Sequence, residues 1–159
     1  MLRFSFATLL ALAPIGASAS DLADRPGWAV YATGLSYSEL VGATVDAITA
    51  NGLIVVTQAG PTKAAANRGI TIPGNRVIGA FNNDFAVRVL ETSTAAMIEA
   101  PIRFYVTENK DGTAILSYKR PSHVFAPYLD AGGDTLAGIA SELDDAFRKV
   151  AETAVNPSQ

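Results

Sequence analysis

Two runs of strand-forming residues on either side of Asp111-Gly112 limit the chain to a fold with antiparallel strand pairing. Residues 102–107 and 113–118 are rich in β-branched and aromatic side chains, which suit the pleated surface of a sheet. The Asp-Gly dipeptide between them favours a tight reversal, because such turns require the positive φ that glycine adopts readily. The sequence therefore predicts a β-hairpin here.

The first half of the chain predicts further strands and one helix. Strands are expected over residues 28–33, 53–57 and 76–81. The run 53–57 is continuously apolar, which predicts a central strand covered on both faces or a strand under a helix. Ser36 and Glu39 have the spacing of a capping box, so a helix is expected to start there and to stop at Asn51-Gly52.

The second half predicts two more helices. One is expected to run from the cap residues 82–84 to about Ile98, before Pro101. The other is capped by Asp134, and its apolar side chains recur every three or four residues. Residues 58–75, with a short helical turn near 63–67, and residues 122–133 are predicted to be irregular.

The order of the predicted elements indicates the fold class. Strand, helix, strand, strand, helix, hairpin and helix make one α+β domain with helices packed on one face of a largely antiparallel sheet. An α/β fold would need several right-handed parallel crossovers, and only the first strand–helix–strand unit is suited to one.

The first 19 residues have the pattern of a secretory signal peptide. Arg3 precedes the apolar stretch 4–13, which is shorter than the roughly 20 apolar residues that span a bilayer. Pro14 and Gly16 interrupt the helix, and the small residues 17–19 suit signal peptidase. We therefore expect a signal peptide over 1–19, a mature domain over 20–157 in the periplasm or secreted, and no transmembrane segment after cleavage.

Composition excludes several kinds of site. The chain has no cysteine, which rules out disulfides, thiol nucleophiles, iron–sulfur clusters and covalent haem attachment. It has a single histidine, His123, so no site with two imidazoles from one chain exists. The net charge of −3, with both signs interspersed, makes nucleic acid an unexpected partner.

His123 is the first candidate for a binding residue. Its neighbours Phe125 and Tyr128 are aromatic, so the imidazole is suited to ligating a haem iron under an aromatic cover, with Met97 or Tyr128 as a second axial ligand. The alternative is an exposed residue without a ligand, because metal sites normally show several ligands and supporting groups.

A second candidate is the polar cluster Asn82-Asn83-Asp84 at a predicted helix start. The free N–H groups and positive dipole end of a helix hold anions or carbonyl groups. The alternative is plain N-capping, which needs no ligand. The residues predicted to line a ligand site are thus His123, Phe125, Tyr128, Asn82 and Asn83, and no catalytic residue or metal-ligand set is assigned.

Five segments also carry a resemblance to a known family. They are residues 39–52, 53–56, 77–83, 100–101 and 117–121. In this order and spacing, they resemble the bacterial domain-of-unknown-function family 302 from residue 37 to residue 128. The resemblance implies a small α+β fold similar to the TATA-box-binding-protein-like arrangement, and homodimers. It implies no reaction.

The chain departs from that family pattern at two places. The family tends to show Gly-Asn-Pro at 82–84, and an Asp-His-type pair within 58–60, where this chain has Gln58-Ala59-Gly60. Histidine-based chemistry therefore does not carry over to the first half of this chain.

Three functions remain open from the sequence. The first is a non-enzymatic periplasmic binding or accessory protein that takes a small apolar ligand or haem near His123, with a periplasmic redox or envelope protein as a candidate partner. The second is a small enzyme using Asn82, Asp84 or His123 as acid, base or orienting group. The third is a dimeric scaffold without a small-molecule site.

Overall fold

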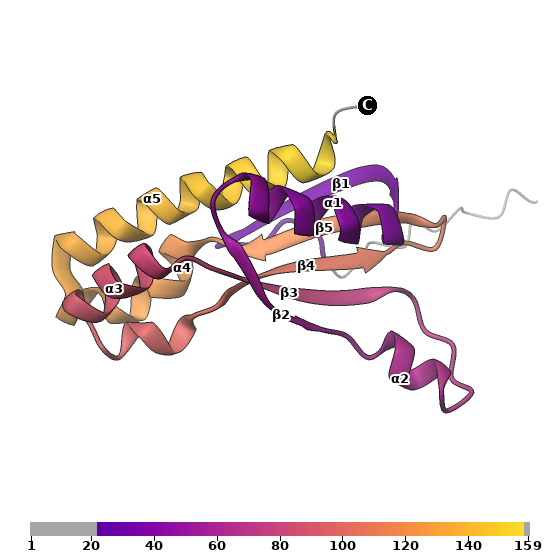
Figure 1. Cartoon of the computed structure of the whole chain (residues 1–159), viewed down its shortest axis with the longest axis horizontal. Helices are drawn as coiled ribbons and strands as arrows, with labels where there is room; N and C mark the ends of the chain where they lie inside the picture. Colours follow the sequence, from indigo (N-terminus) through magenta and orange to yellow (C-terminus); the bar gives the residue numbers. More distant parts are fainter. Residues whose placement is uncertain (1–21, 158–159) are drawn as a thin grey trace, which may run out of the picture.

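Five antiparallel strands form one sheet in the computed structural model, which describes residues 22–157 (Figure 1). The strands lie in the order β1-β5-β4-β3-β2. The predicted hairpin is confirmed, because β4 and β5 pair directly and Gly112 in their turn has a φ of 84°. The strand bounds are β1 (Trp28–Ser36), β2 (Ile54–Ala59), β3 (Asn75–Phe81), β4 (Ile102–Glu108) and β5 (Thr113–Lys119).

Helices cover one face of this sheet. The two longest, α1 (Tyr37–Ala50) and α5 (Leu129–Val155), lie next to each other across it (Figure 1). The predicted α+β class, with helices on one face of an antiparallel sheet, is therefore confirmed. The shorter helices are α2 (Thr62–Ala66), α3 (Asn83–Thr92), α4 (Pro121–Phe125) and the 3₁₀ turns η1 (Ala96–Glu99) and η2 (Ala126–Tyr128).

The core lies between the sheet and α1 and α5. Phe104 of β4 stacks on Phe147 of α5 with ring centroids 4.6 Å apart, and both side chains are fully buried. Tyr118 of β5 packs against both rings. Because side chains alternate along a strand, residues 103, 105 and 107 of β4 point to the opposite face, which α1 and α5 leave uncovered. We call this the open face.

The start of α1 is fixed as predicted. Glu39 Oε2 accepts a hydrogen bond of 2.8 Å from the Ser36 backbone N–H, and Ser36 Oγ accepts one of 3.4 Å from the Glu39 N–H. These bonds satisfy two backbone donors that the helix itself leaves unpaired. The predicted capping box is therefore confirmed.

The prediction that residues 53–57 form a central strand covered on both faces is wrong, whereas its alternative, a strand with a helix over one face, agrees with the burial of Leu53 and the packing of Val55 against the core. After α1 crosses the sheet, β2 pairs only with β3 and forms an edge, so β1 and β2 lie at opposite edges. Ile54 is 55% exposed and Val56 is 45% exposed. A continuous apolar run is equally compatible with a buried strand and with an edge strand, so its composition does not indicate its place in the sheet.

Two predicted helix bounds also change. The helix after Asn82 ends at Thr92 instead of near Ile98, because Ser93 is extended (φ −156°) and its hydroxyl accepts from the Ala96 N–H to begin η1. Residues 122–132, predicted to be irregular, form most of α4, η2 and the first turn of α5. Gly133 (φ 56°) then interrupts α5 directly before Asp134, where the sequence predicts the last helix to start. Pro121 occupies the first position of α4, where its fixed φ favours a helix start.

Residues 60–73 extend beyond the sheet as an arm that carries α2 (Figure 1). None of these residues is buried. The predicted helical turn near 63–67 corresponds to α2.

The predicted signal peptide, residues 1–19, lies outside the described residues. Within residues 22–157, no helix combines the length and the apolar character that crossing a membrane requires.

Candidate functional site

The strand register arranges the side chains of the open face in rows that cross the sheet. Trp28 pairs with Lys119, and Gly79 pairs with Arg103. Phe104 pairs with Tyr118, which places Arg103 and Lys119 at neighbouring positions on β4 and β5. One row therefore runs Trp28, Lys119, Arg103 and Gly79.

The next row is less charged. Ser117 pairs with both Val30 and Tyr105, and Tyr105 pairs with Val77. Since these residues alternate with the core-facing residues of the same strands, such as Phe104 and Tyr118, they face away from α1 and α5.

A cavity of about 540 Å³ lies over these rows. Its floor comes from β1, β3, β4 and β5, and η1, α4 and η2 supply residues at one end. Its lining combines aromatic and aliphatic side chains with a few polar groups. The lining residues are Trp28, Asn75, Val77, Glu99, Ile102, Arg103, Tyr105, Tyr118, Lys119, His123, Val124 and Pro127.

Two hydrogen bonds orient polar groups in this pocket. The Asn75 side-chain amide donates to the Tyr105 hydroxyl oxygen. The Tyr128 hydroxyl donates to Glu99 Oε1 at 2.6 Å, and this bond raises the pKa of Tyr128 above its ordinary value. The one carboxylate of the lining therefore already has a donor.

Two cations, Arg103 and Lys119, belong to the lining. Within residues 22–157, the ion pairs involve neither of them. The Lys119 ammonium lies 5.9 Å from the centre of the Trp28 ring, a cation–π distance.

His123 lies at the rim, on α4. Its side chain is exposed, and its ring packs against Gly27: a Cβ added to Gly27 would lie 2.2 Å from His123 Cγ. The Gly27 carbonyl accepts a 2.8 Å hydrogen bond from the Arg120 N–H, which joins the start of β1 to the start of α4. The absence of a side chain at Gly27 thus sets where the imidazole lies.

Of the five predicted site residues, only His123 lines the open-face pocket directly. Tyr128 reaches it through its hydrogen bond to Glu99. The Phe125 side chain is buried in the core.

Asn82 and Asn83 lie elsewhere, at the start of α3. Asn82 Oδ1 accepts from the N–H groups of Asp84 and Phe85, while its amide donates to the Gly52 carbonyl. Asn82 thus uses both ends of its amide as a cap, and Asn83 and Asp84 are exposed. Asn82, Met97 and Phe125 also line a separate cavity of about 40 Å³, which is close to the volume of one water molecule in the liquid.

The sequence interpretation missed Trp28, Arg103, Tyr105 and Lys119. The signal that would have found them is the alternation within the predicted hairpin, where 103 and 105 are out of phase with the apolar 102, 104 and 106. No cluster of three or more His, Asp or Glu residues suited to a metal ion occurs in the described part of the chain.

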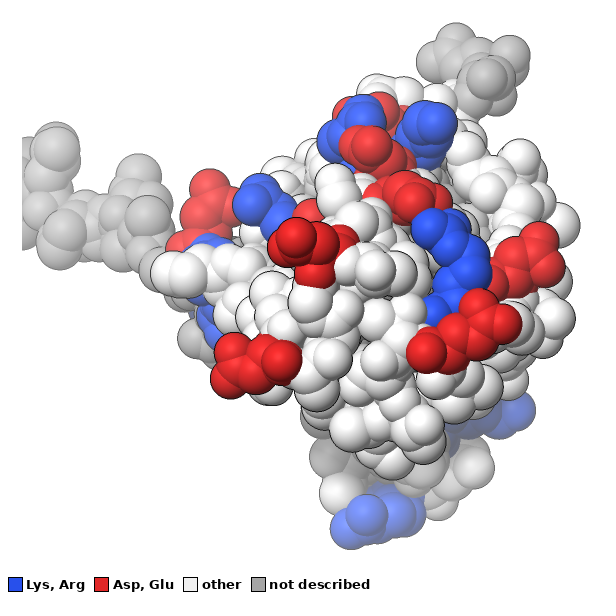
Figure 2. Space-filling model, turned by 90° about the vertical axis from the view of Figure 1, so that its left-hand side faces the viewer, with Lys and Arg blue, Asp and Glu red and all other residues white. Residues whose placement is uncertain are grey.

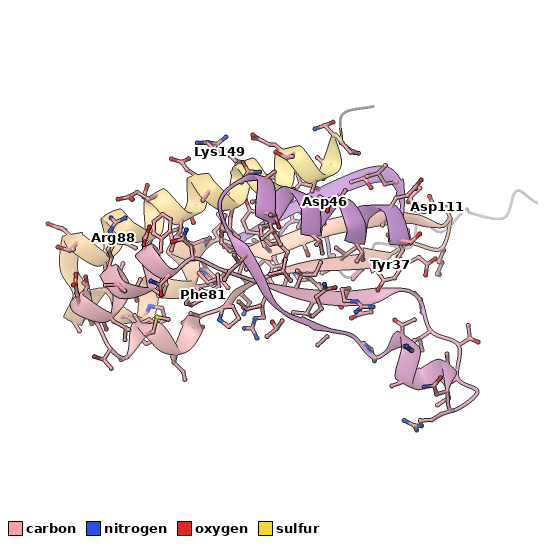
Figure 3. All side chains as sticks on the ribbon, viewed as in Figure 1. Tyr37, Asp46, Phe81, Arg88, Asp111 and Lys149 are labelled. Atoms are coloured by element: carbon pink, nitrogen blue, oxygen red, sulfur yellow. The ribbon has the colours of Figure 1, made fainter. Side chains whose placement is uncertain are left out.

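The end of the molecule that carries α3 and the start of α5 shows both charge signs side by side (Figure 2). There, Arg88 of α3 donates two hydrogen bonds of 2.7 Å to Glu142 of α5 (Figure 3). This end of the molecule therefore presents no surface of a single charge.

Comparisons with known proteins identify the fold and the family. No curated protein matches this chain. A crystal structure of an uncharacterized conserved DUF302 protein from Bacillus stearothermophilus is similar, with a TM-score of 0.69 and 15% identity over 85% of this chain and 100% of that chain. At that identity the likeness concerns the fold alone.

The family model of DUF302, a domain of unknown function, matches residues 29–154. This range contains nearly all of the five strands and of α5. The resemblance expected from the sequence is thus confirmed, and the chain belongs to the DUF302 family.

Proposed function

We propose that this protein binds a small, largely apolar molecule in the open-face pocket. The observation that carries this proposal is the cavity of about 540 Å³, since pockets for small ligands typically enclose about 300–1,000 Å³. Trp28, Val77 and Tyr105 supply apolar and aromatic surface, and a few polar groups accompany them. This combination is typical of small-molecule sites.

The enzyme hypothesis has less support. Asn82 and Asp84 lie at the start of α3, whereas His123 lies on α4 at the open-face pocket. The hydrogen-bonding groups of Asn82 are occupied by capping. The three residues that the hypothesis offers as alternatives therefore do not line one site, and His123 is the one of them that lines the open-face pocket.

Trp28 makes the proposal directly testable, because it is the single tryptophan and lines the pocket. Titration with the neutral probe N-phenylnaphthylamine is expected to quench Trp28 fluorescence while the probe becomes brighter. Val77→Phe fills the pocket and should weaken binding, whereas Val87→Phe, on the exposed side of α3, should not. Absence of binding, or equal weakening by both variants, would contradict the proposal.

Haem is the other ligand that the sequence suggests. His123 lies at the rim of the pocket, but Met97 lines the separate small cavity and the Tyr128 hydroxyl is bonded to Glu99. Of the axial ligands that the sequence suggests, His123 is therefore the one that lines the pocket. A Soret band that appears after haemin addition and is lost in His123→Ala would show that the ligand of the pocket is haem and not another apolar molecule. Absence of a Soret band would exclude haem.

We further propose that the protein acts in the periplasm or outside the cell. The supporting observation is the signal-peptide pattern of residues 1–19. Expression of the full chain followed by N-terminal sequencing of the periplasmic fraction should give Ser20 as the first residue. A full-length chain found only in the cytoplasm would contradict it.

We also propose that two copies associate through β2. This edge strand, Ile54–Ala59, contains no charge and no proline, and it exposes Ile54 and Val56. Natural edge strands normally carry charges, prolines or bulges that prevent pairing; β2 has a register irregularity between Val55 and Thr57 but neither of the other two features. Antiparallel pairing of β2 with its copy would form a symmetric contact. Sedimentation velocity should show a dimer that Val56→Lys dissociates and Ile70→Lys, on the exposed arm, does not.

A further inference from the structure

The open-face pocket contains two positive charges at neighbouring positions. Arg103 lies on β4 and Lys119 on β5. Because Phe104 pairs with Tyr118, the adjacent residues Arg103 and Lys119 lie opposite each other on the two strands. Like charges at such positions repel each other and destabilise a sheet. Within residues 22–157, neither side chain is in an ion pair that would relieve this repulsion.

The surroundings of this pair are poor in negative charge. Glu99 is the one carboxylate in the lining, and it already accepts the hydrogen bond from Tyr128. The pocket therefore has an excess of positive charge in a chain whose net charge is −3. An incoming anion would relieve the repulsion between Arg103 and Lys119.

Tyr105 adds a neutral donor to the same floor. It lies two residues from Arg103 on β4, so both side chains are on the open face. Because Asn75 donates to the Tyr105 oxygen, the phenolic proton remains available to another acceptor. Three donor groups, those of Arg103, Lys119 and Tyr105, thus belong to one pocket.

Apart from Asn75, the remaining floor is largely apolar. Val77 pairs with Tyr105, and the Trp28 ring lies beside Lys119. Gly79, next to Arg103, carries no side chain, and Pro101 and Thr57 close over it: a Cβ at Gly79 would lie 2.9 Å from Pro101 Cγ and 2.3 Å from Thr57 Oγ1. The donors are therefore surrounded by surface that suits a hydrocarbon or aromatic body.

We propose that the ligand of this pocket is an amphipathic carboxylate, whose anionic group is held by Arg103 and Lys119 and whose apolar body lies against Trp28, Tyr105 and Val77. This inference rests on the proposed function, since it names the ligand class of the same pocket. Arginine and lysine bind carboxylates through charge-assisted hydrogen bonds, which are roughly twice as strong as neutral ones.

The test compares phenylbutanoate with its neutral amide, which has nearly the same shape and no charge. Binding is followed by Trp28 fluorescence and by titration calorimetry. We expect the carboxylate to bind at least about tenfold more tightly than the amide, with a preference that weakens as salt is added. The double variant Arg103→Gln/Lys119→Gln should lose the preference and keep the affinity for the amide.

A matched control removes two positive charges from the arm that carries α2. Lys63→Gln/Arg68→Gln changes two exposed residues outside the pocket lining and should leave the preference intact. Equal affinity for acid and amide, with the neutral probe still bound, overturns the carboxylate inference and leaves the proposed function standing. If the wild-type protein binds none of these molecules, the neutral probe included, both the carboxylate inference and the proposed function are overturned.

Discussion

The imidazole of His123 occupies the space in which any other residue at position 27 would place its Cβ. An added Cβ at Gly27 would lie 2.2 Å from His123 Cγ and 2.3 Å from Nδ1. Gly27 also has a φ of 78°, a conformation that favours glycine. The position of His123 at the pocket rim therefore depends on the residue before Trp28.

Gly27→Ala should destabilise the protein more than Gly52→Ala. Gly52 has a φ of 79° and open space where its Cβ would lie, so its substitution costs only the conformational term of about 1–2 kcal/mol. Gly27→Ala carries the same term and must also displace His123. Urea unfolding of both variants, each with and without His123→Ala, measures the difference. If Gly27→Ala still costs more stability than Gly52→Ala in the His123→Ala background, the contact with His123 is not the cause of the difference.

Removal of the Phe147 ring should leave a large cavity in the core and cost much of the stability of the fold. Phe147 stacks on Phe104 at 4.6 Å, and neither side chain is exposed. Phe147→Ala is expected to lower the free energy of unfolding by about 3–5 kcal/mol, measured from the urea midpoint by circular dichroism. Phe147→Leu, which keeps most of the volume, should cost less. A loss under about 1 kcal/mol for the alanine variant would contradict this packing.

The pair Arg88–Glu142 should make stability depend on pH in the acidic range. Two hydrogen bonds from Arg88 lower the pKa of Glu142 below its ordinary value. A carboxylate with a lowered pKa stabilises the fold above its unfolded pKa, and this contribution is lost as the pH falls through the folded pKa. Unfolding curves of wild type and Glu142→Gln should therefore differ at neutral pH and converge on acidification.

Exposure limits the size of this effect. Both side chains are about half exposed, so added salt should reduce the difference. Lys149→Gln provides the control, because Lys149 lies on the outer side of α5, away from the sheet (Figure 3). A difference between wild type and Glu142→Gln that persists unchanged below the pKa of glutamate would contradict the assignment.

Tyr128, which is hydrogen-bonded to Glu99, should lose its phenolic proton at a higher pH than an ordinary tyrosine. The hydrogen bond to the Glu99 carboxylate raises the pKa of Tyr128, so loss of its proton is delayed. In an alkaline absorbance titration, Glu99→Gln should let one tyrosine ionise earlier, and Tyr128→Phe should remove one late step. Burial raises the pKa of Tyr118 as well, so one late tyrosine should remain in both variants. No change in either would show that Glu99 is not engaged by Tyr128.

Local chemistry made much of the fold predictable. The Asp111-Gly112 turn and the Ser36–Glu39 capping box depend on residues close together in sequence, and both are confirmed. The place of β2 depends on the course of α1 across the sheet, which its own residues do not indicate. Its apolar run therefore suggested burial where the structure has an edge.

The pocket was harder to predict for the same reason. His123 stood out because it is the single histidine. Arg103 and Lys119 lie on adjacent strands and meet only through the pairing of β4 with β5, and Trp28 joins them only because β1 pairs with β5. The alternation of side chains along one strand shows which residues share a face. Which residues of different strands lie side by side in a site is known only when the strand order is known.

The strand order also sets when the sheet can be completed during synthesis. β1 pairs with β5 alone, and Trp28 meets Lys119 only after most of the domain has been made. During synthesis, β1 therefore remains unpaired until β5 has left the ribosome. A nascent chain that ends before Thr113 lacks β5, which joins β1 to the rest of the sheet, so we expect N-terminal fragments to aggregate instead of folding.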